Sequence, residues 1–494
     1  MNANERVLLL FSLAAVVVFA LMIIVPTLKR KHEALSFWNL FLLGSLLFTG
    51  LSGVNAATTP DYSPLAKKDY YLFYVGAVVY YTAAAFAYCY LKGPRKLAGK
   101  SLRKWPPMTS VPLMLLTALV AALAVFQMTE VSIPFVGEIV RQFALQSPLI
   151  ALTIAFVAWY QRRGNVLWLV NLLALLVLAL LWSLAAGTSR RYLLSMLMVI
   201  PIGVYWLTLR YKSISQTVLW VAISMAVVLP VLAGYSLIRH SFYWSGESGL
   251  ELSMAALEKL PRAIQNADVT SILDGQDSVE VGLTTIHYVN NPDRGVLTGQ
   301  HFFVPYYVLV NPIPRSVWPE KPESIGAVLP RQLGVWKKTG YINWGVNVVG
   351  QCYYDGGLHI HLLYGLITGW VLRLLDEMLI RKPGNPFMLA LLSASSSQVL
   401  ALSRGCIETF IMQIVAASAV VLFIAWLGRV LFGSKIIDPD TSWTTNAYQA
   451  EAYTMLARAG RLPAPAPQPR RRAYYDDEPD GVTPSEREES SEVD

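Results

Sequence analysis

Four arginine residues give the sequence its clearest chemical signal. Each lies in a polar stretch beside long apolar runs: Arg190 and Arg191 open one such run, Arg315 lies in a Pro- and Trp-rich segment, and Arg404 lies in a short turn. A guanidinium group stays protonated and presents a planar fork of N–H donors that matches phosphate oxygens. We therefore predict that these arginines bind an anionic ligand. For any one of them, the alternative is contact with lipid headgroups or with neighbouring acids.

The motifs of the common catalytic sites are missing. The sequence contains no glycine-rich phosphate loop with Lys-Ser/Thr, no HExxH and no nucleophile elbow. His359 and His361 are two residues apart on a predicted helix, so their side chains point to different faces and cannot easily share a metal ion. The acidic pair Asp438 and Asp440 lies in a tail without a nucleotide-binding fold. We expect neither a metal nor another cofactor.

The composition indicates what kind of protein positions these residues. The chain has 494 residues, of which 54% are hydrophobic and 15% charged, and its mean hydropathy is +0.44. A soluble domain carries about a quarter charged residues, because its surface must be covered. The composition excludes a cytosolic enzyme, a secreted disulfide scaffold and a disordered chain. It predicts an all-α polytopic membrane protein.

Eleven apolar runs are long enough to cross a bilayer as helices, and we place the number of spans between ten and twelve. The first run lacks a small-residue cleavage site, so we interpret it as a retained helix and not as a signal peptide. The predicted spans are 7–28, 35–55, 70–91, 108–128, 144–161, 165–186, 192–209, 214–236, 357–375, 386–402 and 407–432.

The distribution of Lys and Arg sets the orientation of the spans. Fifteen of these cations lie in the short loops after odd-numbered spans, against six in the intervening short loops. Positive loops favour the cytoplasm, so the N-terminus is predicted outside and the C-terminal tail inside. The net charge of +8 therefore reflects orientation and not nucleic-acid binding. The four arginines on the outer side oppose this bias, which strengthens the prediction of an anionic ligand there.

The orientation divides the chain into four parts. The aromatic run 302–307 in the external loop is too short to span the membrane and contains Pro305, which suggests a re-entrant or interfacial segment. The cytoplasmic tail, 434–494, is rich in Pro, Ser and Glu and should be disordered. The parts are the N-terminal spans (1–236), the large external loop (237–356), the C-terminal spans (357–433) and the cytoplasmic tail (434–494).

The cysteines do not form a framework. Cys352 and Cys406 both map to the outer side, where a disulfide is permitted. Nothing in their spacing shows that they meet, so buried free thiols are the favoured interpretation.

One decapeptide in the external loop, 313–322 (IPRSVWPEKP), resembles the I-P-R-x-x-W-P-x-K-P signature of Wzy-type oligosaccharide repeat-unit polymerases. Residues 350–357 (GQCYYDGG) are similar to the Gly- and Tyr-rich segment of that family, although Asp355 stands where an aromatic residue is usual. Residues 187–190 (GTSR) are similar to its G-x-R element. The resemblance covers roughly residues 180–410 in the same order.

The resemblance implies an O-antigen or capsule polymerase of the bacterial cytoplasmic (inner) membrane, with the GT-C-like architecture of metal-independent glycosyltransferases. Such enzymes transfer a growing glycan from polyprenyl pyrophosphate to the nonreducing end of a new lipid-linked repeat unit, at the outer face of the membrane. Its partners would be the lipid-linked oligosaccharide, the bilayer and, as a candidate, a chain-length regulator. Without a metal, cations must neutralise the pyrophosphate leaving group. We assign this role to Arg315, one of Arg190 and Arg191, and Arg404, with Lys321 in support.

Such a transfer also needs a base, or at least a hydrogen-bond acceptor, for the acceptor hydroxyl. We favour His301 and Asp355, and His301 directly precedes the aromatic run; for each of them a role as an ordinary loop residue is the alternative. Other outer candidates are His287, Asp277, Glu280 and Glu320, of which Glu320 could instead contact the sugar or pair with Lys321 or Arg315. Aromatic residues that could stack on sugars, or form an interfacial belt, are Trp318, Trp336, Tyr341, Trp344, Tyr353 and Tyr354.

Three other functions remain open at this stage. A transporter or flippase of lipid-linked sugars would usually carry charges at the middle of its spans and show repeated halves, and neither is evident here. A ligase that moves finished polymer to another acceptor is poorly separated from a polymerase by sequence. A structural partner in an envelope complex would use the external loop for docking.

Overall fold

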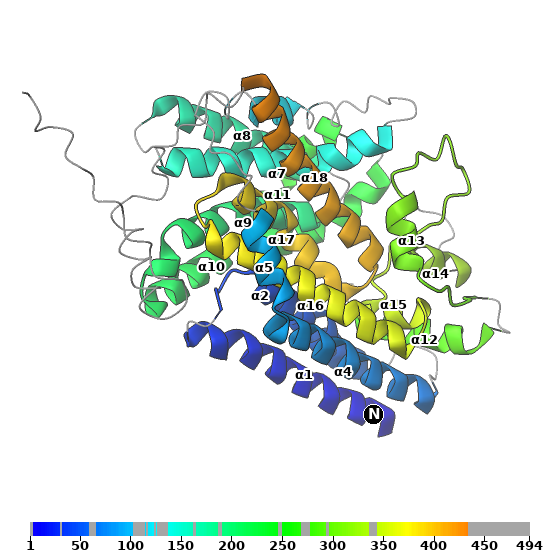
Figure 1. Cartoon of the computed structure of the whole chain (residues 1–494). Coiled ribbons are helices and arrows are strands. Elements are labelled where there is room, and N and C mark those ends of the chain that lie inside the picture. Colours follow the sequence, from blue (N-terminus) through cyan, green and yellow to red (C-terminus); the bar gives the residue numbers. More distant parts are fainter. Residues whose placement is uncertain are drawn as a thin grey trace, which may run out of the picture. The chain divides into compact units, whose positions relative to one another are not determined.

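The computed structural model describes residues 3–432, apart from 30–31, 59–65, 102–113, 115–116, 123–124, 126–136, 162–164, 186–189, 246–248, 268–276, 293–295 and 335–342. Every regular element in these residues is a helix, and they contain no β-strand (Figure 1). Ten helices within the described part are long and apolar enough to cross a membrane. By the length and hydropathy of its helices, the protein is therefore an all-helical, multi-pass membrane protein.

Ten of the eleven predicted spans are confirmed as helices of this kind. The prediction for 108–128 falls largely outside the described residues, although 117–122 are helical. The predicted tail, 434–494, also lies outside them. The helices that carry the spans are α1 (Ala3–Leu28), the continuous α2 (Phe37–Ser45), η1 (Leu46–Leu51) and α3 (Ser52–Thr58), α4 (Lys67–Tyr90), α7 (Gly137–Gln161), α8 (Val166–Ala185), α9 (Arg190–Leu207), α10 (Ile214–Ser245), α16 (Leu358–Arg381), α17 (Pro386–Ala401) and α18 (Ile407–Phe432).

Shorter helices complete the described fold. Most of them come from the predicted external loop. These elements are α5 (Gly93–Ser101), η3 (Leu209–Tyr211), α11 (Gly249–Asn266), α12 (Ser278–Asn290), α13 (Phe303–Val310), α14 (Ile325–Gln332), α15 (Asn347–Tyr354) and η6 (Leu402–Arg404).

Helices α4 and α16 form the closest pair of spans and run side by side, blue and yellow in Figure 1. Gly365 and Gly369 are four residues apart and therefore share one face of α16. A Cβ atom at either position would collide with a backbone carbonyl of α4, that of Tyr80 or that of Ala84. Small residues allow such backbone approach in lipid, where van der Waals contact drives helix association. The contact fixes the register of α4 and α16 and aligns the residues at both of their ends.

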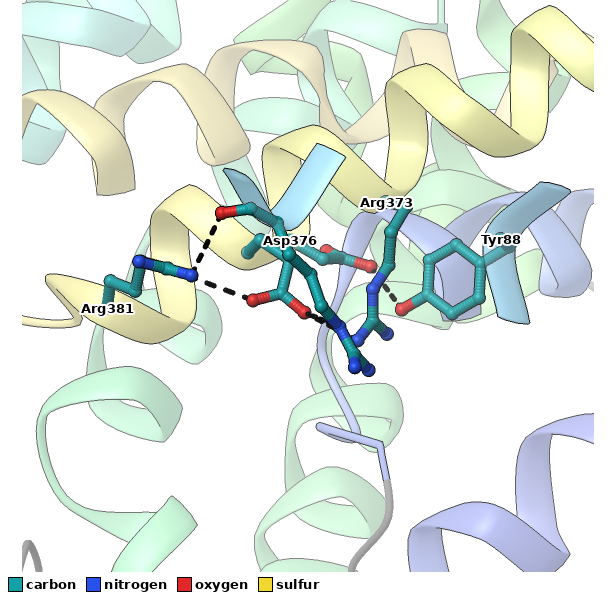
Figure 2. A network of polar contacts seen from close by, with 6 residues as sticks. Tyr88, Arg373, Asp376 and Arg381 are labelled. Atoms are coloured by element: carbon teal, nitrogen blue, oxygen red, sulfur yellow. Dashed lines mark hydrogen bonds and ion pairs between the residues drawn. The ribbon is translucent and has the colours of Figure 1, made fainter. Parts of the chain in front are cut away.

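Charged side chains gather at one end of this pair, which we call the basic end. Arg95 donates to Glu377 at 3.0 Å, and Arg373 and Arg381 of α16 pair with the same carboxylate. Figure 2 shows Arg373 and Arg381 projecting from α16 toward this network. Arg95 and Arg381 come from two loops that the charge bias assigns to the cytoplasm, so these two loops lie at one end of the bundle.

A second contact at the basic end fixes the start of α2. The buried carboxylate of Asp376 accepts hydrogen bonds from the N–H of Phe37 at 2.8 Å and of Trp38 at 3.2 Å. The hydroxyl of Tyr88 donates to the same carboxylate at 2.8 Å (Figure 2). A carboxylate at the N-terminus of a helix satisfies backbone N–H groups that have no partner within the helix. Asp376 therefore joins α2, α4 and α16.

Two short helices from the predicted external loop enter the opposite end of the bundle, which we call the loop end. The segment η1 is π-helical, and its Phe48 carbonyl accepts hydrogen bonds from Ser278 Oγ at 2.6 Å and from Asn347 Nδ2 at 2.9 Å. These residues lie at the starts of α12 and α15. Residues 347–352 of α15 are all fully buried. The irregular turn in a membrane helix thus receives the polar groups of the inserted helices.

The aromatic run 302–307, expected to be re-entrant or interfacial, forms the start of α13 and its N-cap. Its buried residues are Phe303 and Val304, whereas Tyr306 and Leu309 are exposed. The short helices enclosed by the bundle are instead α12 and α15, whose insertion was not predicted from the sequence. Contact of α13 with a membrane surface stays a prediction.

Candidate functional site

The residues at the end of α15 contact several other elements of the candidate site. Tyr353, Tyr354 and Asp355 follow one another there, and successive helical side chains point in different directions. The Tyr353 hydroxyl reaches α12, the Tyr354 ring lies 5.7 Å from that of Phe303, and Asp355 reaches the start of α13. The predicted Gly- and Tyr-rich segment therefore connects several elements of the loop end.

The Asp355 carboxylate caps α13. It is fully buried and accepts hydrogen bonds from the N–H groups of Phe303 and Val304 and from the Tyr364 hydroxyl. Phe302, at the N-cap position, has a φ of 55° and a side chain without a hydrogen-bonding group. The cap that α13 lacks locally is thus supplied by a residue distant in sequence.

The structure brings His301 and Asp355, the two favoured base candidates, together. The N–H of Gln300 donates to the Tyr354 carbonyl at 2.9 Å, and that of Phe302 donates to the Asp355 carbonyl at 3.1 Å. These bonds hold His301 beside the end of α15. Burial raises the pKa of the Asp355 carboxyl to about 6, while its hydrogen bonds and the nearby His301 imidazole act in the opposite direction. His301 is exposed whereas Asp355 is enclosed.

A second imidazole is held by an aspartate on the other side of α15. His287 Nδ1 lies 2.8 Å from Asp69 Oδ2, and Asn290 Nδ2 donates to Asp69 Oδ1 at 3.1 Å. The Tyr353 hydroxyl donates to Asn290 Oδ1 at 2.7 Å. The N–H of Ala66 also donates to Asp69, at 3.1 Å. The result is a continuous hydrogen-bonded chain that joins α4, α12 and α15.

His287 was one of several candidates predicted from the sequence, but its partner Asp69 was not predicted. Asn290 follows His287 by three residues, a spacing that places both on one face of α12. Asp69 lies in the first turn of α4, directly after Lys67 and Lys68, and immediately before a predicted span. Its neighbours in the sequence do not indicate a histidine partner, and only the packing of α12 against α4 shows that Asp69 and His287 belong together.

Arg404 lies in a tightly packed turn between α17 and α18. Gly405 has a φ of 96°, and a Cβ atom there would lie 2.5 Å from the backbone nitrogen of Asn347. The Arg404 side chain crosses Gly345, where a Cβ atom would lie 2.8 Å from its Nε. Because Gly345 and Gly405 have no side chains, the turn that carries Arg404 packs closely against the start of α15.

An acid and a thiol share this turn. Burial raises the pKa of Cys406 to about 12; the nearby Glu408 adds to this shift, and Arg404 opposes it. Glu408 is fully buried. Burial raises the pKa of Tyr354 as well, with further contributions from Glu408 and then Asp355. The start of α18 and the end of α15 are therefore electrostatic neighbours.

Helix α9 begins at Arg190, two residues before the predicted span 192–209, and both of its first arginines face other helices. Arg190 Nη1 donates to Ser236 Oγ of α10 at 3.0 Å. The Arg191 guanidinium carbon lies 4.9 Å from the centre of the Phe410 ring, within cation–π range. Phe410 lies in the first turns of α18, so Arg191 and Arg404 approach the same helix end.

Arg315 and Lys321 of the decapeptide have different surroundings. Lys321 is 6% exposed, and its Nζ donates to the carbonyls of Asn311 at 2.8 Å and Ile313 at 2.9 Å. Half of the Arg315 side chain is exposed, and its Nη1 donates to the Pro319 and Lys321 carbonyls at 3.2 Å. The ammonium therefore folds the loop, whereas the guanidinium keeps part of its surface accessible.

The remaining candidates have the following positions. Trp318, Tyr353 and Trp344 are half-buried, Glu320 is exposed and Tyr354 is buried, while Trp336 and Tyr341 lie outside the described residues. Cys352 and Cys406 are buried free thiols, as predicted. No group of three His, Cys, Asp or Glu side chains within the described ranges is arranged to hold a metal ion.

Comparisons of the chain with protein-family models, with curated proteins and with solved structures found no match. The fold and the site therefore define a class and not a family: an all-helical, multi-pass membrane protein with ten candidate spans in its described part.

Proposed function

We propose that the protein is a metal-independent membrane glycosyltransferase with a GT-C-like architecture that polymerises lipid-linked oligosaccharide repeat units. In this proposal it transfers a growing glycan from polyprenyl pyrophosphate to the nonreducing end of a new lipid-linked repeat. The reaction takes place at the outer face of the bacterial cytoplasmic membrane. Support comes from the resemblance of the decapeptide 313–322 and from the cations of the loop end.

The observation that carries the proposal is the approach of Arg191 and Arg404 to the start of α18. Arg191 stacks on Phe410 at 4.9 Å, and Arg404 lies in the turn that leads into the helix. The charge bias of the loops predicts that the loop end faces outward. Arginines on that side oppose the bias, and binding of an anionic ligand explains why they are there. A pyrophosphate leaving group gains negative charge as it departs, and arginine donors stabilise it without a metal.

Arg315 supports the proposal in a different way. Its guanidinium is half exposed, and the loop that carries it is held by the buried ammonium of Lys321. An arginine on a rigid loop can approach a headgroup phosphate without first ordering the backbone. In this interpretation Lys321 positions the loop, and Arg315 contacts the phosphate.

Deletion of the gene, followed by complementation with variants, tests the proposal. Gel analysis of the surface glycan should change from a ladder to a single repeat in the deletion strain, and wild-type protein should restore the ladder. Arg315→Ala and Arg404→Ala should fail to restore it at normal protein level. Arg331→Ala is the matched control, because Arg331 is an arginine of the same loop that pairs with Glu323 at 2.7 Å.

Other outcomes contradict the proposal. Unligated long chains in the deletion strain would indicate a ligase. Lipid-linked repeats retained on the cytoplasmic side would indicate a flippase. A full ladder from both Arg315→Ala and Arg404→Ala would leave these arginines without a catalytic role.

A further inference from the structure

We propose that His287 is the general base of this transferase and that Asp69, Asn290 and Tyr353 position its imidazole. The inference rests on the proposed function, since a base is needed only where a hydroxyl is the acceptor. It assigns the acceptance of the hydroxyl proton, a role that the arginines do not fill.

The hydrogen bonds determine which nitrogen of His287 can act. An ionised carboxylate only accepts hydrogen bonds, so the nitrogen facing it at 2.8 Å, Nδ1, carries the hydrogen. In the neutral ring the other nitrogen, Nε2, then holds the lone pair and can accept a proton. Asp69 in turn is fixed by Asn290 at 3.1 Å and by the Ala66 N–H at 3.1 Å. The imidazole is thus oriented before any substrate arrives.

Burial differs between the two partners in the way a base requires. The Asp69 side chain is 2% exposed, which keeps water from competing for its hydrogen bonds, while the His287 side chain retains 14% exposure. Asp355, in contrast, is enclosed and already accepts three hydrogen bonds as the cap of α13. His301 is exposed beside Gly356. Among these candidates, His287 combines orientation with access.

The position of His287 also suits the proposed reaction. Helix α15 contacts α12 through Tyr353 at its end, and its first residue, Asn347, packs on Gly405 beside Arg404. An eight-residue helix is about 12 Å long. His287 and the turn that carries Arg404 are therefore held at opposite ends of the short helix α15. Both lie at the loop end of the bundle.

The proposed step balances as a displacement. The acceptor hydroxyl gives its proton to His287 Nε2, while its oxygen forms a bond to the anomeric carbon of the donor glycan. The bond between that carbon and the pyrophosphate oxygen breaks, and its electron pair leaves with the polyprenyl pyrophosphate. Asp69 stabilises the imidazolium until the proton passes to water.

The alternative is that Asp69 and His287 only tie α12 to α4, and two substitutions separate these roles. His287→Gln retains an amide that can donate to Asp69 but has no basic nitrogen. It should fold normally and transfer glycan about 10² to 10⁴ times more slowly. His287→Ala should regain activity when imidazole is added, which a lost tether would not explain. His359→Gln, an exposed histidine beside Gly356, is the matched control.

The assay uses purified full-length protein and lipid-linked oligosaccharides extracted from the deletion strain, with product length read on gels. Full activity of His287→Gln would overturn the proposal. So would a result in which His301→Gln loses activity while His287→Gln keeps it, because the base would then be His301.

A second measurement does not depend on glycan transfer. Diethyl pyrocarbonate modifies neutral imidazole nitrogens, and mass spectrometry can follow its reaction at His287. We expect rapid modification in the wild type and a rate roughly tenfold or more lower in Asp69→Asn, because the lone pair is no longer directed to Nε2. If Asp69→Asn slows the modification of His287 but the wild type transfers no glycan, the proposed function is wrong, whereas the orientation of His287 by Asp69 is supported. If Asp69→Asn leaves the rate unchanged, the positioning role of Asp69 fails.

Discussion

The ammonium of Lys321 lies 2.8 Å from the carbonyl oxygen of Asn311, ten residues earlier in the chain. The same group donates to the Ile313 carbonyl at 2.9 Å, and the side chain is buried. The lysine of the decapeptide therefore closes the loop that carries Arg315. Two neighbouring cations of one motif differ in role because one is enclosed by carbonyls and the other is half exposed.

Replacement of Lys321 by Met should loosen this loop. Methionine fills a similar volume but leaves the Asn311 and Ile313 carbonyls without this donor, at a cost of about 1–3 kcal/mol for each one that stays buried. We expect a lower midpoint of thermal unfolding in detergent and faster proteolysis near 311–322. Arg331→Met should leave both unchanged, because a surface ion pair contributes little. Equal resistance of Lys321→Met and the wild type would contradict the structural role.

The arginine turn should be sensitive to a single methyl group. Gly405→Ala combines a left-handed backbone conformation with a Cβ atom 2.5 Å from the Asn347 nitrogen, so the turn or the start of α15 must move. Gly334→Ala is the matched control, since its φ is 68° but nothing lies within 4 Å of the added atom. We expect Gly334→Ala to cost about 1 kcal/mol and Gly405→Ala clearly more, measured as unfolding midpoints. Equal effects would show that the close approach is unimportant.

The buried ion pair between Arg210 and Glu33 at the basic end should stabilise the fold only while both partners are charged. Arg210 Nη2 lies 3.0 Å from Glu33 Oε1, with side chains 2% and 14% exposed, and the Tyr205 hydroxyl donates to Glu33 at 2.8 Å. Glu33→Gln leaves a buried guanidinium without its counter-charge, which costs about 3–5 kcal/mol. The double variant Glu33→Gln/Arg210→Met should unfold at a higher temperature than Glu33→Gln alone. A double variant less stable than the single one would contradict this interpretation.

The spans were predictable because each depends on local composition. A run of about 20 apolar residues must satisfy its backbone within itself in lipid, which makes it a helix regardless of its partners. The buried free thiols of Cys352 and Cys406 were also predicted, because nothing in their spacing indicated that they meet.

The candidate site was predictable only in part, because it depends on distant contacts. Asp69 and His287 are 218 residues apart, and nothing in either neighbourhood specifies the other. Asn347 and Gln351 are polar, yet both are fully buried in the enclosed helix α15. Asn347 can be buried because the Phe48 carbonyl in the π-helical turn accepts its side-chain hydrogen bond, and a sequence pattern does not reveal that turn.

The buried carboxyl of Asp355 should make stability depend on pH. Burial raises its pKa from 3.8 to about 6, so between these values the folded protein binds a proton more tightly than the unfolded chain. Stability is therefore complete below about pH 4 and decreases as the pH rises to 6, by roughly 3 kcal/mol in all. Asp355→Asn does not titrate, so the unfolding midpoint of the wild type should fall relative to this variant across that range. Tyr364→Phe removes a hydrogen bond that lowers the pKa of Asp355, so it should extend the decrease above pH 6. A constant difference between wild type and Asp355→Asn from pH 4 to 7 would contradict the raised pKa.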